Sequence, residues 1–574
     1  MLLAEISPPL NGFGWPDWLV VAAYLVLTTI LGAALSGRAS TIRDFFLGGR
    51  KLPWWAICGS IVATEVSAAT IVGVPTISFA AGGNLTYLQL ALGSILARFI
   101  IARYFINRYY EHEIYSPYDY VGTRLGPRVR QTTTGLFFVG AVLGQGARLY
   151  ITAFVLSVVA GINLTTAIWL MGAFAVGWTL IGGMVTVIWT DVIQFVVMVV
   201  GAGAALIAAV VAVPGGFAEV ARFADQTDKL RLFNLSPDLS VEYTLWCGLL
   251  ALPFLNLAAF GTDQVMAQRF FCCKTQADAR KAVLWSNISL FIPVLMLFVG
   301  IAIAAYFQHA SLTTTEQALM KQDKNYLLPL FIVHQLPVGL RGLVVAAIFA
   351  AAISTLEGAL AALSQATVGL VYPADRLAGE EDRRTAAGRM SLVVLSKLLV
   401  IGWGVALCLM AIGCITIAKQ YKNVIDLALS LVRYTYGPLL GIFLLAFLRR
   451  PPDDRGLFWA VGLAIMAVIG MSIHDLKPVL ILGRMQDLSD AFVWSAAALA
   501  SLVGWFRFRL DAWRPAIVAA TSVLIVLLHH LQVGTTPHGD PLRMAAYWHY
   551  PIAALMTFAV GYLLGRRDEE KQMQ

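Results

Sequence analysis

Long hydrophobic runs alternate with short polar loops along almost the whole chain. A run of about 20 apolar residues can cross a bilayer as a helix, because each residue adds about 1.5 Å to a path of about 30 Å. By this criterion the pattern predicts about fifteen transmembrane helices. The predicted spans are 17–36, 55–80, 85–106, 131–159, 163–182, 187–212, 243–266, 282–307, 340–371, 390–416, 425–448, 456–474, 489–507, 514–533 and 546–565.

The composition agrees with a membrane protein that has many spans. Of the 574 residues, 59% are hydrophobic and only 13% are charged, and the mean hydropathy is +0.75. A soluble core of this size cannot bury so large an apolar share. We therefore expect an all-α polytopic membrane protein that is surrounded by the lipid bilayer.

Clusters of Lys and Arg predict the orientation of the chain. The formal net charge is +8, but the basic residues lie in short loops between hydrophobic runs, which is not the pattern of a nucleic-acid-binding surface. The positive-inside rule places the heavily basic loops in the cytoplasm, the N-terminus outside and the C-terminus inside. The loop 214–240 departs from the rule, although its acidic residues offset its basic ones. The cytoplasmic clusters are Arg38, Arg43, Arg50 and Lys51; Arg103, Arg108, Arg124, Arg128 and Arg130; Arg269, Lys274, Arg280 and Lys281; Arg383, Arg384 and Arg389; Arg449, Arg450 and Arg455; and Arg507, Arg509 and Arg514.

No segment of the sequence has the pattern of an enzyme. There is no HExxH, GxSxG or Walker motif, and the six cysteines form no CxxC pair, so we interpret them as packing residues. The eight histidines are scattered, and only His529 and His530 are adjacent. We expect no cleavable signal peptide, because no basic region with a small-residue cleavage site precedes the first span. We expect a protein of the bacterial-type inner (plasma) membrane that is not an enzyme and that acts within the bilayer.

Two of the hydrophobic segments are interrupted. Segment 55–80 contains Gly73 and Pro75, and segment 243–266 contains the stretch LALPFLNLAAFGTDQ. In transporters built from inverted repeats, interrupted helices in corresponding positions of the two halves mark the binding site near the bilayer midplane. Because each interrupted segment opens a set of five predicted helices, the spacing fits a five-plus-five inverted repeat.

Four motifs occur in an order that is typical of one family. They are FFLGGRKLP (45–53), GGMVTVIWTDVIQ (182–194), GTDQVMAQRFF (261–271) and LPVGLRGLVVAAIFAAAISTLEGALAALSQ (336–365). In these motifs the chain resembles the sodium:solute symporter family, which contains sodium-coupled sugar, proline, iodide, monocarboxylate, pantothenate and sialic acid carriers. The resemblance covers roughly residues 15–450, and the last four spans carry no motif that we can name.

The resemblance implies the LeuT-type fold, in which the core is a five-plus-five inverted repeat. It divides the chain into a leading transmembrane helix with a cytoplasmic loop (1–52), a first repeat (53–235), a second repeat (236–450) and four trailing helices (451–574). It also implies a symporter in which inward sodium flow drives the import of a small organic solute by alternating access. Sodium is then the coupling ion, and we expect a monomer or a weak oligomer.

Oxygen atoms in two segments suit a sodium ion, which prefers about five or six oxygen ligands. Ala351, Ser354 and Thr355 are spaced at i, i+3 and i+4, so one helix face offers a carbonyl and two hydroxyls. Ala63 and Val66, in the first interrupted segment, add two carbonyls. These five positions match the common sodium site of the family. The alternative is that both hydroxyls bond back to carbonyls of their own helix.

Asp191 is a candidate for a cation route. It follows a glycine pair near the predicted cytoplasmic start of a span, where an acid suggests either a cation pathway or a carboxylate satisfied by the helix N-terminus. Some members of the family hold an additional sodium with this acid and with hydroxyls just after the Ser-Thr pair. This chain has Glu357 and Gly358 at those places, so that hydroxyl set is missing.

Glu65 is a lone carboxylate in the apolar stretch ATEVSAATIVGVP. Near the bilayer midplane a carboxylate either binds a proton or finds a cation. Arg148, mid-span with Gln145 one turn before it, is the available partner. Three interpretations stay open: Arg148 alternates between Glu65 and a substrate carboxylate, the pair is purely structural, or Glu65 carries protons in place of sodium.

In the family, the substrate wall uses positions just after the first break and at the start of the next span. An intramembrane arginine favours an anionic solute, and the sialic acid carriers have an arginine on the corresponding helix and similar residues at the Thr70 and Gln89 positions. Sialic acid or another sugar acid or carboxylate is therefore the favoured solute, although Glu65 replaces an uncharged residue of those carriers. The alternative for Ser67 and Thr70 is a close helix crossing. The predicted substrate site consists of Glu65, Ser67, Thr70, Tyr87, Gln89, Gln145, Arg148, Asn256 and Phe260.

The motif GTDQVMAQRFF is interpreted as an inner-gate network or a loop anchor, formed by Asp263, Gln264, Gln268 and Arg269. Two other functions stay open. One is a sodium/sugar or sodium/amino-acid symporter. The other is a membrane solute sensor without transport, since this module is fused to signalling domains in some bacterial proteins; the short tail GRRDEEKQMQ disfavours that function.

Overall fold

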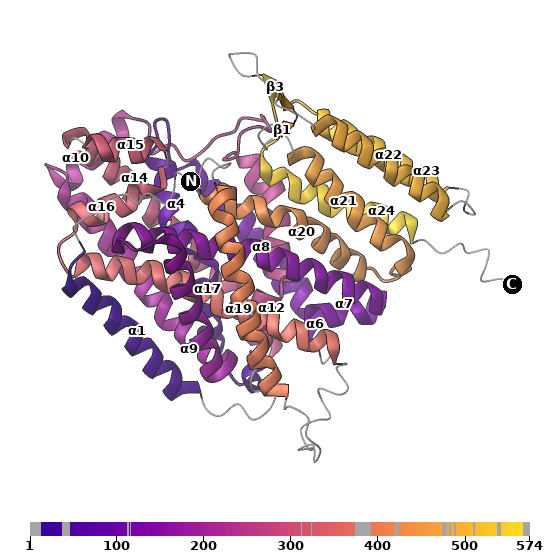
Figure 1. Cartoon of the computed structure of the whole chain (residues 1–574), viewed down its shortest axis with the longest axis horizontal. Helices are drawn as coiled ribbons and strands as arrows, with labels where there is room; N and C mark the ends of the chain where they lie inside the picture. The colour runs from indigo at the N-terminus through magenta and orange to yellow at the C-terminus, as the bar shows by residue number, and fades with distance from the viewer. Residues whose placement is uncertain are drawn as a thin grey trace. The chain divides into compact units, whose positions relative to one another are not determined.

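The computed structural model describes residues 13–36, 46–111, 114, 116–310, 313–322, 324–372, 392–418, 424–472, 479–481, 484–486, 489–508, 511, 513–535 and 541–565. Within these residues the chain is mostly helical, with two short β-hairpins (Figure 1). Several basic residues that entered the prediction of orientation lie outside the described residues: Arg38, Arg43, Arg383, Arg384, Arg389 and Arg509.

The contacts divide the chain into two compact units, which are described separately. The first comprises 1–91, 141–234 and 264–428, and the second comprises 92–140, 235–263 and 429–574. The first unit contains α1 (Trp15–Ser36), α3 (Trp54–Glu65), α4 (Ala68–Phe79), α9 (Leu164–Ala212), α10 (Gly216–Gln226), α12 (Gln264–Phe271), α13 (Gln276–Trp285), α14 (Phe291–His309), α15 (Thr314–Gln322), α16 (Leu327–Gln335), α17 (Leu340–Val371) and α19 (Leu392–Ile417), and α8 (Pro127–Ala160) contributes to both units. The second contains most of α5 (Leu90–Ile100), α6 (Ile106–Tyr110), α7 (Pro117–Leu125), η4 (Cys247–Ala251), α11 (Leu252–Asn256), η5 (Leu257–Thr262), most of α20 (Val424–Ala446), α21 (Leu457–Ser472), α22 (Ser489–Phe508), α23 (Arg514–His530), α24 (His549–Leu564) and the strands β1 (Val479–Ile481), β2 (Arg484–Gln486), β3 (Gly534–Thr535) and β4 (Pro541–Leu542). The predicted boundaries of the two repeats are a separate matter and stay a prediction.

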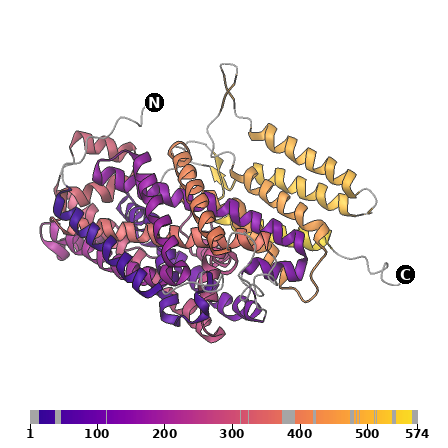
Figure 2. The same ribbon diagram turned by 60° about the horizontal axis from the view of Figure 1, so that its bottom comes forward.

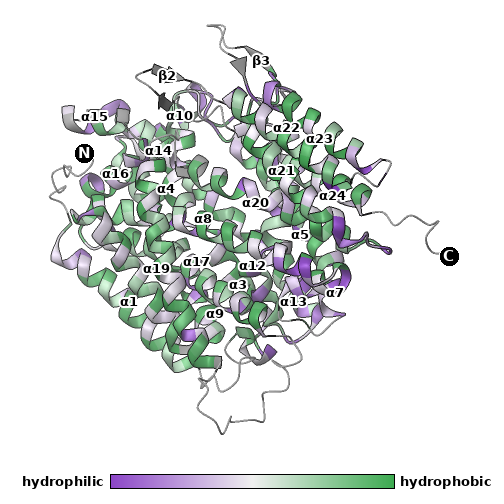
Figure 3. Ribbon diagram, turned by 45° about the vertical axis from the view of Figure 1, so that its right-hand side comes forward, coloured by the Kyte–Doolittle hydropathy of each residue, from purple (hydrophilic) through white to green (hydrophobic). Residues whose placement is uncertain are grey.

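Each predicted span corresponds to a helix, to part of a long helix or to a bent pair of helices. Within the described residues, 11 helices are long and apolar enough to cross a membrane, and two bent pairs raise the number to 13. The two remaining predicted spans are α23 and α24, which have only 17 and 16 residues. Figure 3 shows hydrophobic residues along α1 and α9, and hydrophilic residues gathered in α7 and α13. Within the described residues, the last two predicted spans are therefore formed by shorter helices than the other thirteen.

The first interrupted segment bends between α3 and α4, by 58°. The two residues at the bend, Val66 and Ser67, have extended backbone with ψ of 97° and 169°. Gly73 and Pro75, which suggested the interruption, lie inside α4, so the break comes earlier in the chain than these residues. Its position leaves the last carbonyls of α3 without helical partners.

The second interrupted segment bends by 54° at Asp263, which is extended with ψ of 131° between the π-helical turn η5 and α12. A third irregularity lies in α9, which joins two of the predicted spans. Gly183 has φ of +61°, and the apolar spans Leu164–Ile181 and Gly183–Ala212 meet at this residue. Glycine adopts this left-handed conformation without steric cost, so the glycine pair permits two spans to follow each other directly.

The last four helices form a packed group within the second unit. Helices α21 to α24 lie side by side around a buried apolar cluster that includes Leu463, Val493 and Val518 (Figure 2). The antiparallel hairpins β1–β2 and β3–β4 connect α21 to α22 and α23 to α24. Because α22 and α23 pack against each other, the first turn of α22 lies beside the last turn of α23.

Lys229, in the loop 214–240, caps the end of α4. Its Nζ donates to the carbonyls of Ser78 and Ala80, each at 2.7 Å, and the residue is only 4% exposed. Burial lowers the pKa of Lys229. The last carbonyls of a helix lack partners, and a cation there is favourable. This role accounts for one of the basic residues that depart from the positive-inside pattern.

Replacing Lys229 with methionine is expected to lower the midpoint of thermal unfolding, because two carbonyls lose a charged donor in a buried place. Hydrogen bonds to charged groups contribute about 1.5–3 kcal/mol each, so we expect a loss in that range. The matched control is Arg231→Met, which removes an exposed cation paired with the exposed Asp228 and is expected to change little. Equal midpoints for the two variants in detergent would exclude the capping role.

Candidate functional site

The break between α3 and α4 faces the middle of α17. Thr355 Oγ1 donates to the carbonyl of Thr64 in the last turn of α3, at 3.3 Å, and to the carbonyl of Ala351 at 2.9 Å. Ala63, Ala351 and Thr355 are fully buried. The structure therefore brings a hydroxyl of α17 to the helix end where carbonyls are released.

Ser354 extends this group of oxygen atoms toward α9. Its Oγ donates to Asp191 Oδ1 at 2.5 Å and lies 3.4 Å from Thr64 Oγ1. The donor set contains carbonyl, hydroxyl and carboxylate oxygens, which are the ligands of a hard monovalent cation. The chemistry of these oxygens suits sodium, and the assignment of the five predicted positions as its ligands stays a prediction.

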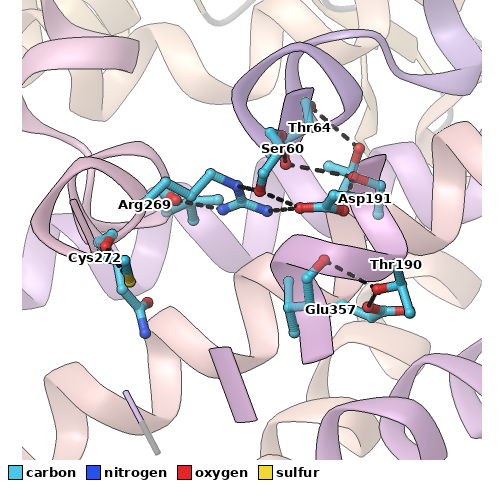
Figure 4. Close-up of polar contacts among 12 residues, drawn as sticks. Ser60, Thr64, Thr190, Asp191, Arg269, Cys272 and Glu357 are labelled. Atoms are coloured by element: carbon cyan, nitrogen blue, oxygen red, sulfur yellow. Dashed lines mark hydrogen bonds and ion pairs between the residues drawn. The ribbon is translucent and has the colours of Figure 1, made fainter. Parts of the chain in front are cut away.

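Asp191 is held by side chains from three other helices. Its Oδ2 accepts from Arg269 Nη2 at 3.1 Å and from the hydroxyl of Ser60, and Arg269 Nε donates to Ser60 at 2.9 Å (Figure 4). Asp191 and Arg269 are both 0% exposed. The alternative that a helix N-terminus satisfies Asp191 is wrong, because Asp191 lies well inside α9 and its partners are side chains. The candidate cation route and the candidate gate arginine are thus direct partners.

Gly358 makes room for the Arg269 guanidinium. A Cβ atom at this glycine would lie 2.4 Å from Nη2 and 2.7 Å from Nη1 of Arg269. A larger residue at this position would require the guanidinium to shift. The glycine thus allows the close approach of Arg269 to α17.

The predicted gate residues do not share one partner. Gln264 Nε2 donates to Gln365 at 2.9 Å, and Gln268 Nε2 donates to the carbonyl of Phe46 at 2.9 Å. In the second unit, Asp263 Oδ2 accepts from the Tyr436 hydroxyl at 2.8 Å. These contacts reach different helices, so the residues of this motif anchor several segments. Whether they act as a gate stays a prediction.

A second buried carboxyl group, that of Glu357, lies near Asp191. Glu357 Oε2 accepts from Thr190 Oγ1 at 3.1 Å. Glu357 Oε1, both amide atoms of Gln194 and the Tyr24 hydroxyl have no hydrogen-bond partner among the described residues, although Gln194 lies beside both Tyr24 and Glu357. Polar groups thus continue from α3 across α9 to α1. The sequence analysis noted Glu357 only because it occupies a place where a hydroxyl was expected, and it did not identify Tyr24.

Among the predicted substrate residues of the first unit, Glu65 and Ser67 lie at the break itself. Ser67 precedes α4 and is 5% exposed, and the Glu65 carboxylate acts electrostatically on the Tyr87 phenol. Gln89 is held by its neighbours, since its Oε1 accepts from Asn234 N at 3.1 Å and its Nε2 donates to the Thr86 carbonyl at 3.2 Å. Glu65 and Tyr87 are thus brought together. Gln145 and Arg148 both lie on α8, where Gln145 is buried and Arg148 is half-buried. The pairing of Arg148 with Glu65 stays a prediction.

Asn256 and Phe260 lie in the second unit. The guanidinium of Arg98 is 4.5 Å from the centre of the Phe260 ring, which is a cation–π distance, and it also bonds to the Ser94 hydroxyl. Arg98 is 0% exposed. Sequence reasoning missed this buried cation, although an arginine inside the predicted span 85–106 was a signal that could have found it.

Comparisons with known proteins agree with these features. The family model "Sodium:solute symporter family" matches residues 45–463. The human sodium/iodide cotransporter is 28% identical over 475 residues, covering 80% of this chain and 71% of that protein. Human sodium-coupled monocarboxylate transporter 1 is 29% identical over 469 residues, covering 80% of this chain and 74% of that protein.

A solved structure of a Na+-coupled sialic acid symporter, in a substrate-bound outward-open state, is also similar. It matches with a TM-score of 0.67 and 22% identity, covering 93% of this chain and all of that chain. This likeness concerns the fold, and the predicted LeuT-type fold is confirmed.

Proposed function

The chain belongs to the sodium:solute symporter family, and from this premise we propose that it is a sodium-coupled symporter that imports an organic anion, with Arg148 as the carboxylate partner. Sodium is the coupling ion of the family, and the protein is an integral membrane transporter. The observation that carries the choice of an anion is Arg148, a cation placed on the membrane helix α8. Sialic acid or another sugar acid is the favoured solute.

The similar proteins support an anionic solute in a general way. Their names refer to iodide, monocarboxylates and sialic acid, all of which are anions. Arginine binds carboxylates through two parallel hydrogen bonds, which lysine cannot reproduce. Arg148 would therefore both attract and orient the solute.

Sodium would bind at the break, where it would hold α3 and α17 together. The proposed ligands are the carbonyls of Ala63, Val66 and Ala351 and the hydroxyls of Ser354 and Thr355. A cation shared by two helices favours the arrangement in which both present their oxygens. Because Ser67 and Thr70 begin the helix after the same break, sodium binding would also order the neighbouring solute site. Reciprocal coupling between sodium and solute then follows from linkage.

Replacing Arg148 with alanine is expected to abolish stabilisation by anionic solutes. The measurement is the unfolding midpoint of the purified protein in sodium or in choline buffer, with sialic acids, sugar acids and monocarboxylates as ligands. A bound ligand raises the midpoint according to its concentration relative to its Kd. Removing one partner of a buried charge pair costs about 2 kcal/mol or more, so the apparent Kd should rise about 30-fold or more.

The matched control is Arg103→Ala, which removes an exposed arginine from the span Thr86–Tyr110 and should leave the shift intact. A sodium-dependent shift by an anion that survives in Arg148→Ala would refute the role of this arginine. No sodium effect with any solute in the wild type would instead refute sodium coupling and favour Glu65 as a proton carrier.

A sodium/amino-acid symporter is the second candidate, and Glu65 is the observation that favours it. A carboxylate beside Tyr87 at the break could pair with the ammonium group of a zwitterion. Neutral sugars and amino acids in the same ligand panel separate the candidates, since Glu65→Gln should weaken only solutes that carry an ammonium group.

We also propose the orientation with the N-terminus outside and the C-terminus in the cytoplasm of the plasma membrane. Among the described residues, Arg103, Arg108, Lys274 and Arg280 would then lie toward the cytoplasm. Labelling of single cysteines at these positions from either side of the membrane tests this topology.

A further inference from the structure

We propose that Asp490, His529 and His530 form a binding site for a divalent transition-metal ion of the Zn²⁺ class, where α22 and α23 meet. The proposal is independent of sodium-coupled transport and gives the trailing helices a role that no sequence motif provided. Its starting point is the one pair of adjacent histidines in the sequence.

The packing of the two helices assembles the three residues. Asp490 lies in the first turn of α22, and both histidines end α23. One ligand atom of each residue lies within 4.8 Å of the other two. Imidazole nitrogen and carboxylate oxygen are preferred zinc ligands, and three protein ligands with a water in the fourth position is a common arrangement.

His529 is held in the orientation that a metal ligand needs. Its Nδ1 lies 2.8 Å from the carbonyl of Gly470, and the residue is 0% exposed. A carbonyl only accepts, so Nδ1 must carry a hydrogen, and the lone pair of the neutral ring is then on Nε2. Gly470 lies in the last turn of α21, where carbonyls lack helical partners. Metal-binding histidines are commonly fixed in this way through their second nitrogen.

The contact between His529 and Asp490 requires a proton or a metal ion between the two side chains. Nε2 of His529 is 2.7 Å from Asp490 Oδ1, and both atoms are acceptors when the ring is neutral. A proton or a metal ion must lie between them. The His530 ring, whose centre is 4.8 Å from that of His529, favours the metal, because it supplies a third ligand that a shared proton would not use.

The surroundings permit the small adjustment that metal binding requires. The Asp490 side chain is 65% exposed, so it can move outward from hydrogen-bond distance to the separation of two zinc ligands. Arg543, the charged group next to this turn, donates to the backbone carbonyl of His529 at 2.6 Å and so fixes the end of α23. The metal would thus tie the first turn of α22 to the last turn of α23.

The test uses the full chain, purified without a histidine tag and treated with EDTA. ZnCl₂ is the probe, and MgCl₂ is the comparison, because a site with two imidazoles discriminates against magnesium. We expect zinc but not magnesium to raise the unfolding midpoint. His530→Ala, at an exposed position, is expected to weaken zinc binding about 10- to 100-fold without loss of fold. His309→Ala removes another exposed histidine near an acid and should bind zinc like the wild type.

Asp490→Asn is the second variant and should weaken zinc binding to a similar degree. Cobalt absorption provides a readout of coordination that does not depend on stability. Equal zinc affinity in the wild type and His530→Ala would overturn the proposal, since binding would then lie elsewhere. So would the absence of any zinc shift in the wild type, in which case His529 and Asp490 share a proton. Either result would leave sodium-coupled transport untouched.

Discussion

Replacing Thr355 with alanine is expected to raise the sodium concentration for half-maximal stabilisation by about 10- to 100-fold, because a charged contact is worth about 1.5–3 kcal/mol. The Thr355 hydroxyl reaches the released end of α3 as well as its own helix, so it is placed to share a cation between α3 and α17. Alanine removes the oxygen and leaves the backbone carbonyls. The measurement is the unfolding midpoint against sodium at constant ionic strength, with choline as the replacement, followed by sodium-dependent uptake in proteoliposomes.

Two controls separate a sodium ligand from a structural hydroxyl. Thr355→Ser retains the oxygen and should bind sodium nearly as the wild type does. Thr179→Ala removes an equally buried hydroxyl, which bonds back to Ala175 at 2.8 Å on α9, and should leave sodium affinity unchanged. If Thr355→Ala and Thr179→Ala respond alike to sodium, the back-bonded interpretation of Thr355 is correct and sodium binds elsewhere.

The transmembrane helices could be predicted from the sequence because the signal is local. An apolar run of about 20 residues has few alternatives to a helix in a bilayer. The position of the break between α3 and α4 was harder to predict from the sequence. Pro75 is the strongest helix breaker in that stretch, yet it lies inside α4, and the chain becomes extended at Val66 and Ser67. Ser67 is a common type of N-cap residue and precedes α4, but its side chain makes no capping hydrogen bond. Val66 has only a weak preference against a helix. These local signals are weaker than that of Pro75, so tertiary contacts also contribute to the position of the break.

The candidate site could be predicted only in part, because its contacts join distant segments. Asp191 and Arg269 are 78 residues apart, and Ser60 is 131 residues from Asp191. The motifs identified both charged residues but gave no reason to pair them. Ser60 and Thr64, spaced at i and i+4 in an apolar helix, were a local signal that α3 presents a polar face. The partners of that face depend on which helices pack against α3, and the hydrophobic periodicity of the sequence does not show this.

Breaking the buried ion pair between Asp191 and Arg269 should destabilise the protein more than any other single change considered above. Both side chains are 0% exposed, so removing one partner leaves a charge without compensation in the bilayer interior. Such changes cost about 3–5 kcal/mol. We therefore expect Asp191→Asn and Arg269→Met each to lower the unfolding midpoint strongly. Asp191→Asn should also weaken sodium binding, because Ser354 loses the carboxylate that orients its hydroxyl.

The double variant distinguishes a charge pair from two independent packing contacts. Arg269→Met alone leaves the Asp191 carboxylate buried, whereas Asp191→Asn with Arg269→Met removes both charges, so the double variant should be less destabilised than the sum of the single variants. The surface pair Glu219 and Arg222, at 2.7 Å with the arginine 63% exposed, is the control and should show a coupling below about 1 kcal/mol. Additive effects at Asp191 and Arg269 would mean that the guanidinium acts mainly through its contacts with Ser60 and the Val265 carbonyl. A large coupling would instead identify Arg269 as the cation that compensates the Asp191 carboxylate beside the proposed sodium ligands.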